Sequence, residues 1–206
     1  MTLQGGIPVR LFFGVDVTPD IRSELAGVQS RLQEQGVKAG NWSRPELFHL
    51  TLLFIGETRE EHLETLLAIG KETARQASAF SLILGRIGVF ERNRILWVGI
   101  HNDSGMEALR QVYRVMTGLA ANQPFIKVDE RPYSPHLTLA RKLEPGSISR
   151  VKEVMANESV SLPDPARLFP VQSICLFASK QVNGRLAYPI VERFYFEGAH
   201  AASKKA

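Results

Sequence analysis

His49-Leu50-Thr51-Leu52 and His136-Leu137-Thr138-Leu139 are the same tetrapeptide at two places in the chain. Side chains alternate between the two faces of a strand, so each histidine shares a face with the threonine about 6.6 Å further along. The leucines occupy the opposite face, where they can anchor the strand in a core. A single His-x-Thr is uninformative, because such alternation is common in half-buried strands. The identical pair predicts two strands that each offer one imidazole and one hydroxyl to a common space.

The regions around the two tetrapeptides repeat the same order of predicted elements. Residues 10–89 contain strand, helix, strand, helix and strand, and residues 94–178 contain the same series. A last strand pair reaches residue 196, and residues 197–206 form a small, basic tail that we expect to be disordered. The repeat predicts a single α+β domain over residues 1–206. We expect two pseudo-symmetric lobes of mainly antiparallel sheet with outer helices, and an active-site groove between the lobes.

Local signals predict several boundaries of these elements. Thr18-Pro19 is typical of a helix start, with threonine as N-cap and proline in the first turn. Thr58-Arg59-Glu60-Glu61 has the pattern of a capping box, which predicts a helix from there to about Gln76. Glu91-Arg92-Asn93 and Asn183-Gly184 are predicted turns between strands.

The composition indicates a globular protein, with 44% hydrophobic and 22% charged residues. The net charge of +4 favours an anionic ligand, although a slightly basic protein without such a ligand has the same charge. Cys175 is the single cysteine, which excludes an internal disulfide and a cysteine-based metal site. We find no metal-binding motif, signal peptide or membrane-spanning stretch. These features predict a cytoplasmic protein that needs no metal.

Several longer stretches resemble one known family. They are Arg10-Leu11-Phe12-Phe13, Phe48 to Glu57, Leu96-Trp97-Val98-Gly99, Pro135 to Arg141 and Leu176-Phe177-Ala178-Ser179. Together with the two His-x-Thr motifs, they resemble the two-histidine phosphoesterase superfamily. The details are similar to its bacterial RNA 2′,3′-cyclic phosphodiesterase branch, the LigT/ThpR-like proteins, also called the 2′-5′ RNA ligase family. The resemblance runs from about residue 10 to residue 196.

The resemblance implies hydrolysis of an RNA 2′,3′-cyclic phosphate end to a 2′-phosphate, without a cofactor. His49 would donate a proton to the leaving ribose oxygen, and His136 would accept a proton from water. Histidine suits both tasks because its ordinary pKa is close to 6.5. Thr51 and Thr138 would donate hydrogen bonds to the phosphate oxygens. The motifs are identical, so the sequence by itself leaves open which histidine is the acid.

Three further residues are candidates for the same site. Arg141 matches a basic residue of the family and would hold phosphate, provided that its strand ends or bulges. By strict alternation Arg141 would face away from His136, and its other interpretation is a solvated arginine at a strand end. Trp42 and Tyr133 could stack on an RNA base, or could equally pack in the core.

The expected partner is RNA with a cyclic phosphate end, for example a tRNA fragment, and we expect a monomer with no membrane partner. The same step run in reverse would join RNA ends through a 2′-5′ bond. One alternative is a cyclic phosphodiesterase for a small nucleotide or ADP-ribose cyclic phosphate. Another is an RNA-binding module without turnover, which would need neither histidine.

Overall fold

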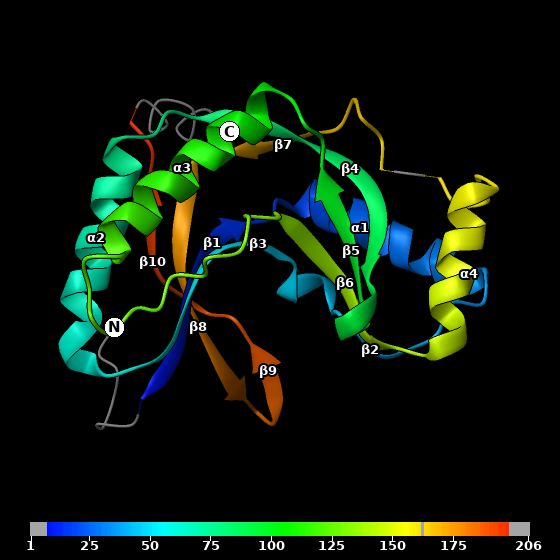
Figure 1. Cartoon of the computed structure of the whole chain (residues 1–206), viewed down its shortest axis with the longest axis horizontal. Coiled ribbons are helices and arrows are strands. Elements are labelled where there is room, and N and C mark those ends of the chain that lie inside the picture. Colours follow the sequence, from blue (N-terminus) through cyan, green and yellow to red (C-terminus); the bar gives the residue numbers. More distant parts are fainter. Residues whose placement is uncertain (1–7, 162, 198–206) are drawn as a thin grey trace.

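The computed structural model describes residues 8–161 and 163–197 (Figure 1). Its α-helices are α1 (Pro19–Glu34), α2 (Leu63–Arg75), α3 (Ser104–Ala120) and α4 (Pro145–Ala156). Its strands are β1 (Val9–Asp16), β2 (Ala39–Trp42), β3 (His49–Thr58), β4 (Phe80–Phe90), β5 (Ile95–Ile100), β6 (His136–Leu143), β7 (Leu168–Val171), β8 (Ser173–Val182), β9 (Arg185–Ala187) and β10 (Ile190–Tyr195). Three short 3-10 helices are η1 (Pro45–Leu47), η2 (Glu60–His62) and η3 (Glu91–Asn93). These elements confirm the predicted α+β class.

The strands form one strongly curled antiparallel sheet in the order β10-β8-β1-β3-β6-β5-β4-β7. The short strands β2 and β9 add to β6 and β8. The two motif strands, β3 and β6, are neighbours at the centre of this order and pair at Leu50 and Leu137. The repeated tetrapeptides therefore lie side by side, in opposite directions, at the middle of the sheet.

The two lobes of the sheet do not coincide with the two halves of the sequence. Strand β4 from the first half pairs with β5, and strand β8 from the second half pairs with β1. One lobe therefore contains β1, β3 and β8, while the other contains β4, β5 and β6. The two halves differ by the short strands β2, between α1 and β3, and β7, between α4 and β8, and each half contributes its last strand to the sheet of the other lobe.

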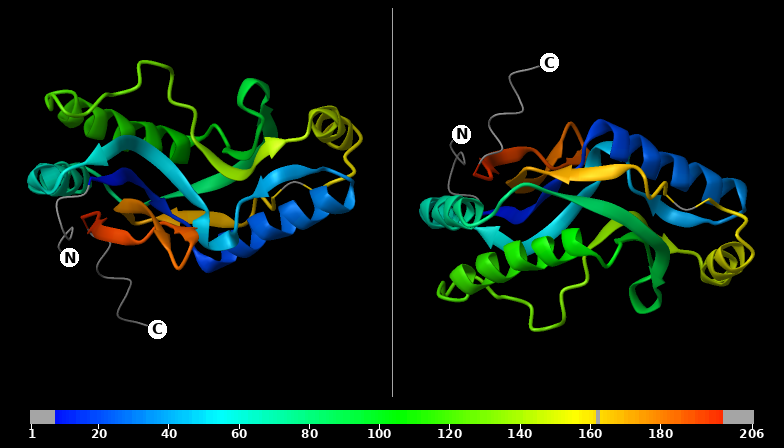
Figure 2. Two further views of the ribbon diagram at one scale, coloured as in Figure 1. Left: turned by 90° about the horizontal axis from the view of Figure 1, so that it is seen from below. Right: turned by 90° about the horizontal axis from the view of Figure 1, so that it is seen from above.

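The helices cover the outer side of the curled sheet (Figure 2). Each lobe is covered by one helix from the first half of the sequence and one from the second half. Helices α2 and α3 pack together, and α2 contacts β8 and β10. Helix α1 lies on the other lobe, where Gln29 donates a hydrogen bond to the Leu139 carbonyl of β6 at 2.7 Å. Helix α4 contacts β4 of that lobe. The concave side between the lobes is left for the motif side chains.

The motif leucines form part of the core, as the alternation predicts. Leu50, Leu137 and Leu139 are fully buried, and Leu52 is nearly so. Fully burying one such side chain contributes about 1.5–3 kcal/mol. The apolar face of each motif therefore anchors the strand that presents its polar face.

Some predicted boundaries are correct and others are wrong. Helix α1 begins at Pro19 after Thr18, and the turn at Asn183 and Gly184 has the two positive φ angles that a tight hairpin requires. The capping box is wrong, because Thr58 ends strand β3 and its hydroxyl donates to the Gly56 carbonyl. The longer helix begins only at Leu63, after η2.

Strand β2 has no clear sequence signal, since Ala39-Gly40-Asn41-Trp42 is short and mixed, and it forms by pairing with β6. Among the residues that the structure describes, no helix is long and apolar enough to cross a bilayer. The predicted disorder of the tail concerns residues outside the described ranges, apart from Glu197.

Candidate active site

The four polar side chains of the two motifs lie on one face of the sheet. His49, Thr51, His136 and Thr138 are all half-buried, and they alternate with the buried leucines. Leu50 of β3 pairs with Leu137 of β6, so the polar side chains on either side of these leucines project from adjacent strands toward the same space. The sheet thus brings together two imidazoles and two hydroxyls that are far apart in sequence.

Both histidine rings are held in the same way. The Nδ1 atom of His49 lies 2.7 Å from the Leu47 carbonyl, and that of His136 lies 2.8 Å from the Ser134 carbonyl. A carbonyl only accepts hydrogen bonds, so in each ring Nδ1 carries the proton and donates it. Each neutral ring then has an unprotonated Nε2 for proton transfer. The contact to the residue two positions earlier is a shared feature that the tetrapeptide alone does not reveal.

Aromatic side chains from other parts of the sheet contact each histidine ring. His49 packs against Phe12 at 4.8 Å between ring centroids and meets Tyr188 edge-on at 5.0 Å. His136 meets Phe90 edge-on at 4.9 Å. These contacts remove water from both imidazoles and fix their orientation.

The environment disfavours the charged form of both histidines. Burial lowers the pKa of His49 to about 4, the Leu47 carbonyl opposes this shift, and the positive charges of Arg141, His136 and Arg22 add to it. Burial likewise lowers the pKa of His136, with the Ser134 carbonyl opposing and Arg141 adding to the shift. Without a bound anion, the neutral form of His49 therefore dominates at pH 7.

The positive charge of Arg141 adds to the lowering of the pKa of both His49 and His136, so its guanidinium lies within electrostatic reach of the two rings. Strict alternation fails here, because Leu139 and Ala140 are both buried and Arg141 is exposed. The pairing of β5 with β6 shows the irregularity: Trp97 lies opposite Thr138 and Leu96 opposite Ala140, so Leu139 is an extra residue in β6. Strand β6 therefore has a bulge at Leu139, which meets the condition that the sequence set for Arg141, and the role of Arg141 as a phosphate ligand stays a prediction.

A family model described as the 2′-5′ RNA ligase superfamily matches residues 31–183, including both motifs. The chain belongs to this superfamily.

Relatives within the superfamily align over much of the chain. An RNA 2′,3′-cyclic phosphodiesterase of Thermus thermophilus is 28% identical over 197 residues, which cover 93% of this chain and 92% of the relative. A protein of the same name from Bacillus subtilis is 31% identical, over 64% of this chain and 70% of its own. The crystal structure of E. coli LigT complexed with 3′-AMP has a TM-score of 0.73 at 25% identity, and the match covers 92% of this chain and 99% of LigT.

The two aromatic candidates both pack against other residues of the protein, and base stacking by either one stays a prediction. Tyr133 stacks on Tyr113 with 4.0 Å between ring centroids, and its hydroxyl donates to the Thr51 carbonyl at 3.0 Å. One face of the Tyr133 ring is therefore covered, and the side chain ties the segment before β6 to β3. Trp42 is partly buried against the main core, on the strand that pairs with β6. Both residues support the motif strands of this superfamily member.

Sequence reasoning missed the charged residues beside His49. A cavity of about 290 Å³ lies there, lined by Asp16, Arg22, Glu46, Leu47, Phe48, His49, Phe177, Tyr188 and Ile190. Asp16 follows an apolar strand and Arg22 lies on an amphipathic helix, so neither has a signal of its own in the sequence. Only the antiparallel pairing of β1 with β3, which sets Asp16 opposite His49, brings them to the site.

The described residues contain no group of three or more histidine, cysteine, aspartate or glutamate side chains that could hold a metal ion. In the same ranges, the hydroxyls of Thr51 and Thr138 form no hydrogen bond with another residue, which leaves them free to donate to a ligand.

Proposed function

We propose that this protein hydrolyses RNA 2′,3′-cyclic phosphate ends to 2′-phosphate ends, using its two histidines as general acid and general base. The observation that carries the proposal is the shared geometry of the motifs. Each Nδ1 is bound to a backbone carbonyl, so each Nε2 is available beside a free threonine hydroxyl. Two such imidazoles on one face provide the acid and the base that opening a cyclic diester needs.

The reaction would proceed by attack of water on phosphorus. The Nε2 of His136 takes a proton from the water as its oxygen bonds to phosphorus. The bond from phosphorus to O3′ breaks, and the Nε2 of His49 gives its proton to that oxygen. Thr51, Thr138 and Arg141 hold the non-bridging oxygens, where negative charge increases in the transition state.

Substrate binding would adjust the protonation of the site. His49 must carry a proton to act as the acid, yet its pKa is about 4 without ligand. A phosphate anion beside the two rings favours their charged forms and counters the effect of Arg141. The bound substrate therefore promotes the protonation that the reaction requires.

The names of the relatives support the choice of RNA ends as substrate. Those from Thermus thermophilus and Bacillus subtilis are named RNA 2′,3′-cyclic phosphodiesterases, and LigT binds 3′-AMP. The name of the superfamily refers to ligation, in which a ribose hydroxyl replaces water as the nucleophile and a 2′-5′ bond forms. Hydrolysis ranks first because water is in large excess.

The decisive experiment uses a short RNA with a 2′,3′-cyclic phosphate end, incubated with the protein in the presence of EDTA. We expect a 2′-phosphate product, distinguished from the cyclic substrate by mass and phosphatase sensitivity and from the isomeric 3′-phosphate by chromatography against standards. His49→Ala and His136→Ala should each lower kcat about 10²-fold to 10⁴-fold, the usual contribution of general acid–base catalysis. His101→Ala is the matched control, because His101 lies at the end of β5 with a 65% exposed side chain.

The possible results separate the alternatives. No turnover of RNA by the wild type, but turnover of a small cyclic nucleotide, would favour the small-molecule phosphodiesterase. RNA binding with no turnover of either substrate would favour a binding module. Turnover that survives both motif substitutions would refute two-histidine catalysis.

A further inference from the structure

The two histidines have equivalent carbonyl partners, but these carbonyls are held by different parts of the molecule. The partner of His136 belongs to Ser134, in the segment that Tyr133 ties to β3 through the Thr51 carbonyl. The partner of His49 belongs to Leu47, the last residue of the short helix η1. A single 3-10 turn has little stability of its own. The orientation of His49 therefore depends on what holds η1 in place.

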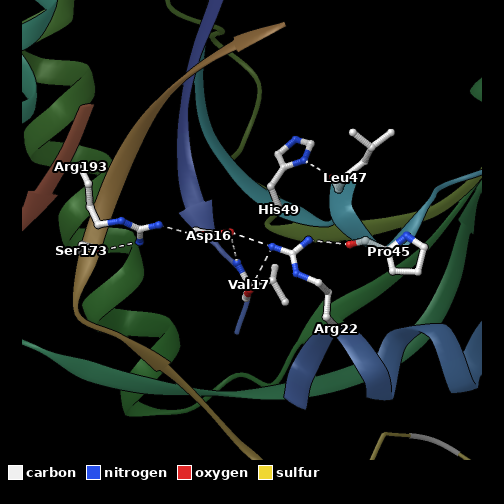
Figure 3. A network of polar contacts seen from close by, with 8 residues as sticks. All are labelled: Asp16, Val17, Arg22, Pro45, Leu47, His49, Ser173 and Arg193. Carbon is white, nitrogen blue, oxygen red and sulfur yellow. Dashed lines mark hydrogen bonds and ion pairs between the residues drawn. The ribbon is translucent and has the colours of Figure 1, made fainter. Parts of the chain in front are cut away.

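Arg22 of α1 holds this turn, as Figure 3 shows. One terminal nitrogen of its guanidinium donates to the Pro45 carbonyl, the first residue of η1, at 2.6 Å. The other donates to a carboxylate oxygen of Asp16 at 2.9 Å and to the Val17 carbonyl at 3.0 Å. The rigid, planar guanidinium thus connects η1 to the end of β1.

Asp16 is held in turn from the opposite side. Its second carboxylate oxygen accepts a hydrogen bond from Arg193 of β10 at 2.6 Å, and Arg193 also donates to the Ser173 hydroxyl. Asp16 also lies opposite His49 in the register of β1 and β3. The side chains of Asp16, Arg22 and Arg193 are only 24–30% exposed. Such partly buried, charge-assisted bonds hold their geometry better than ion pairs on the open surface.

We infer that Asp16, Arg22 and Arg193 form a positioning network that fixes His49, through η1 and the Leu47 carbonyl, in the tautomer with a free Nε2. The network does not act on His136, whose carbonyl partner it does not contact. The catalytic consequence rests on the proposed function, whereas the effect on the His49 tautomer can be tested without any substrate.

The test replaces Arg22 and reads the two histidines separately. Arg22→Met removes the charge and every donor, while Arg22→Lys keeps the charge but loses the fork that bridges Pro45 and Asp16. Asp16→Asn removes the carboxylate that joins the two arginines. Arg150→Met is the matched control, because Arg150 also donates to a backbone carbonyl, that of Gln35, in another part of the molecule.

Long-range ¹H–¹⁵N NMR at pH 8 reports which ring nitrogen of each neutral histidine carries the proton. In the wild type and in Arg150→Met, we expect the Nδ1–H tautomer for both histidines. In Arg22→Met and Asp16→Asn, we expect His49 to become a mixture of tautomers while His136 stays unchanged. The His136 signals and the thermal unfolding curve show whether each variant is folded.

The kinetic readout distinguishes positioning from direct substrate binding. We expect Arg22→Met to lower kcat about 10-fold to 100-fold with KM nearly unchanged, since a displaced catalytic group costs about this much. Arg22→Lys should have a kcat between those of Arg22→Met and the wild type, because one ammonium group cannot reproduce the fork that joins the Pro45 carbonyl to the Asp16 carboxylate.

An unchanged His49 tautomer in folded Arg22→Met and Asp16→Asn would overturn the inference. A large rise in KM with an unchanged tautomer would show instead that Arg22 contacts the substrate. If the wild type fails to turn over cyclic phosphates, the proposed function fails, but the NMR result still decides the positioning network.

Discussion

In the proposed mechanism, the histidines and threonines of the two motifs have separate roles that can be assigned to single atoms. Nδ1 of each ring is bound to the backbone and only Nε2 faces the groove, while the threonine hydroxyls of the same face have no partner among the described residues. A hydroxyl aimed at a phosphate oxygen lowers the barrier only if it remains free to donate. The threonines are therefore expected to act on the transition state more than on folding.

Replacing either threonine by valine keeps the shape of the side chain and removes the donor. We expect Thr51→Val and Thr138→Val each to raise the barrier by about 2.7–4 kcal/mol, or about 10²-fold to 10³-fold in kcat. Thr117→Val on α3 is the control, because that hydroxyl bonds only to carbonyls of its own helix. Steady-state kinetics on the cyclic phosphate RNA would measure the effect, and an unchanged kcat in both motif variants would remove the threonines from the mechanism.

The lowered pKa values of the histidines predict the pH dependence of the reaction. In the proposed mechanism, the reactive free enzyme has one charged and one neutral imidazole, a state that is most populated between the two pKa values. Burial places the pKa of His49 at about 4 and lowers that of His136 as well. We expect a bell-shaped kcat/KM profile centred below pH 6.5, and a kcat profile displaced to higher pH because the bound phosphate favours protonation. A kcat/KM profile centred above pH 7 would contradict this prediction.

At the scale of elements, strand β1 lies very close to the first motif strand. Gly14 of β1 is opposite Thr51, and a Cβ atom added to it would lie 2.8 Å from the Leu50 carbonyl oxygen. Real Cβ atoms do not come this close to a backbone oxygen, so any larger side chain must push β1 away from β3. Glycine at this position allows the tight pairing that sets Asp16 opposite His49.

We expect Gly14→Ala to lower the free energy of unfolding by about 1–3 kcal/mol, as overpacking in a core usually does. Gly118→Ala is the matched control, because Gly118 lies in α3 with open space around it. Alanine in a helix interior is more stable than glycine by about 0.5–1 kcal/mol, so the two changes should have opposite signs. Urea unfolding at neutral pH would measure both, and a stable Gly14→Ala variant would show that the close approach is easily relaxed.

At the scale of the whole molecule, the exchange of strands β4 and β8 makes the lobes interdependent. The sheet of each lobe is completed by a strand from the other half of the sequence. The motif strands β3 and β6 lie where the lobes meet, and the lowered pKa values of their half-buried histidines link the stability of the fold to pH. The pH dependence of the free energy of unfolding therefore tests whether the pKa of His49 is lowered in the folded protein.

The pKa of His49 is about 4 in the folded protein and close to 6.5 when the chain is unfolded. Between these values the unfolded chain binds more protons, so the free energy of unfolding falls as the pH drops from 6.5 to 4. We expect His49 to account for a loss of about 2–3 kcal/mol between pH 7.5 and pH 4.5. The loss should be smaller by this amount in His49→Gln and unchanged in His101→Gln, as measured by urea unfolding. An equal loss in the wild type and His49→Gln would mean that His49 titrates normally.

The sequence by itself determined the α+β class and the common face of His49, Thr51, His136 and Thr138. These features are encoded locally, because alternation along a strand and the periodicity of a helix depend only on neighbouring residues. The identical tetrapeptides revealed the site because alternation makes each pair of polar side chains share a face. The false capping box at Thr58 shows the limit of such local signals, since sheet pairing extended β3 through that residue.

Only the tertiary structure decided how the two halves combine and what surrounds the histidines. The exchange of β4 and β8, the bulge at Leu139 and the network of Asp16, Arg22 and Arg193 all depend on pairing between distant strands. No local pattern specifies such pairing, because it is selected by the burial of apolar faces throughout the molecule. The same reason explains Tyr133, whose ring packs on Tyr113 and whose hydroxyl reaches a strand far away in sequence.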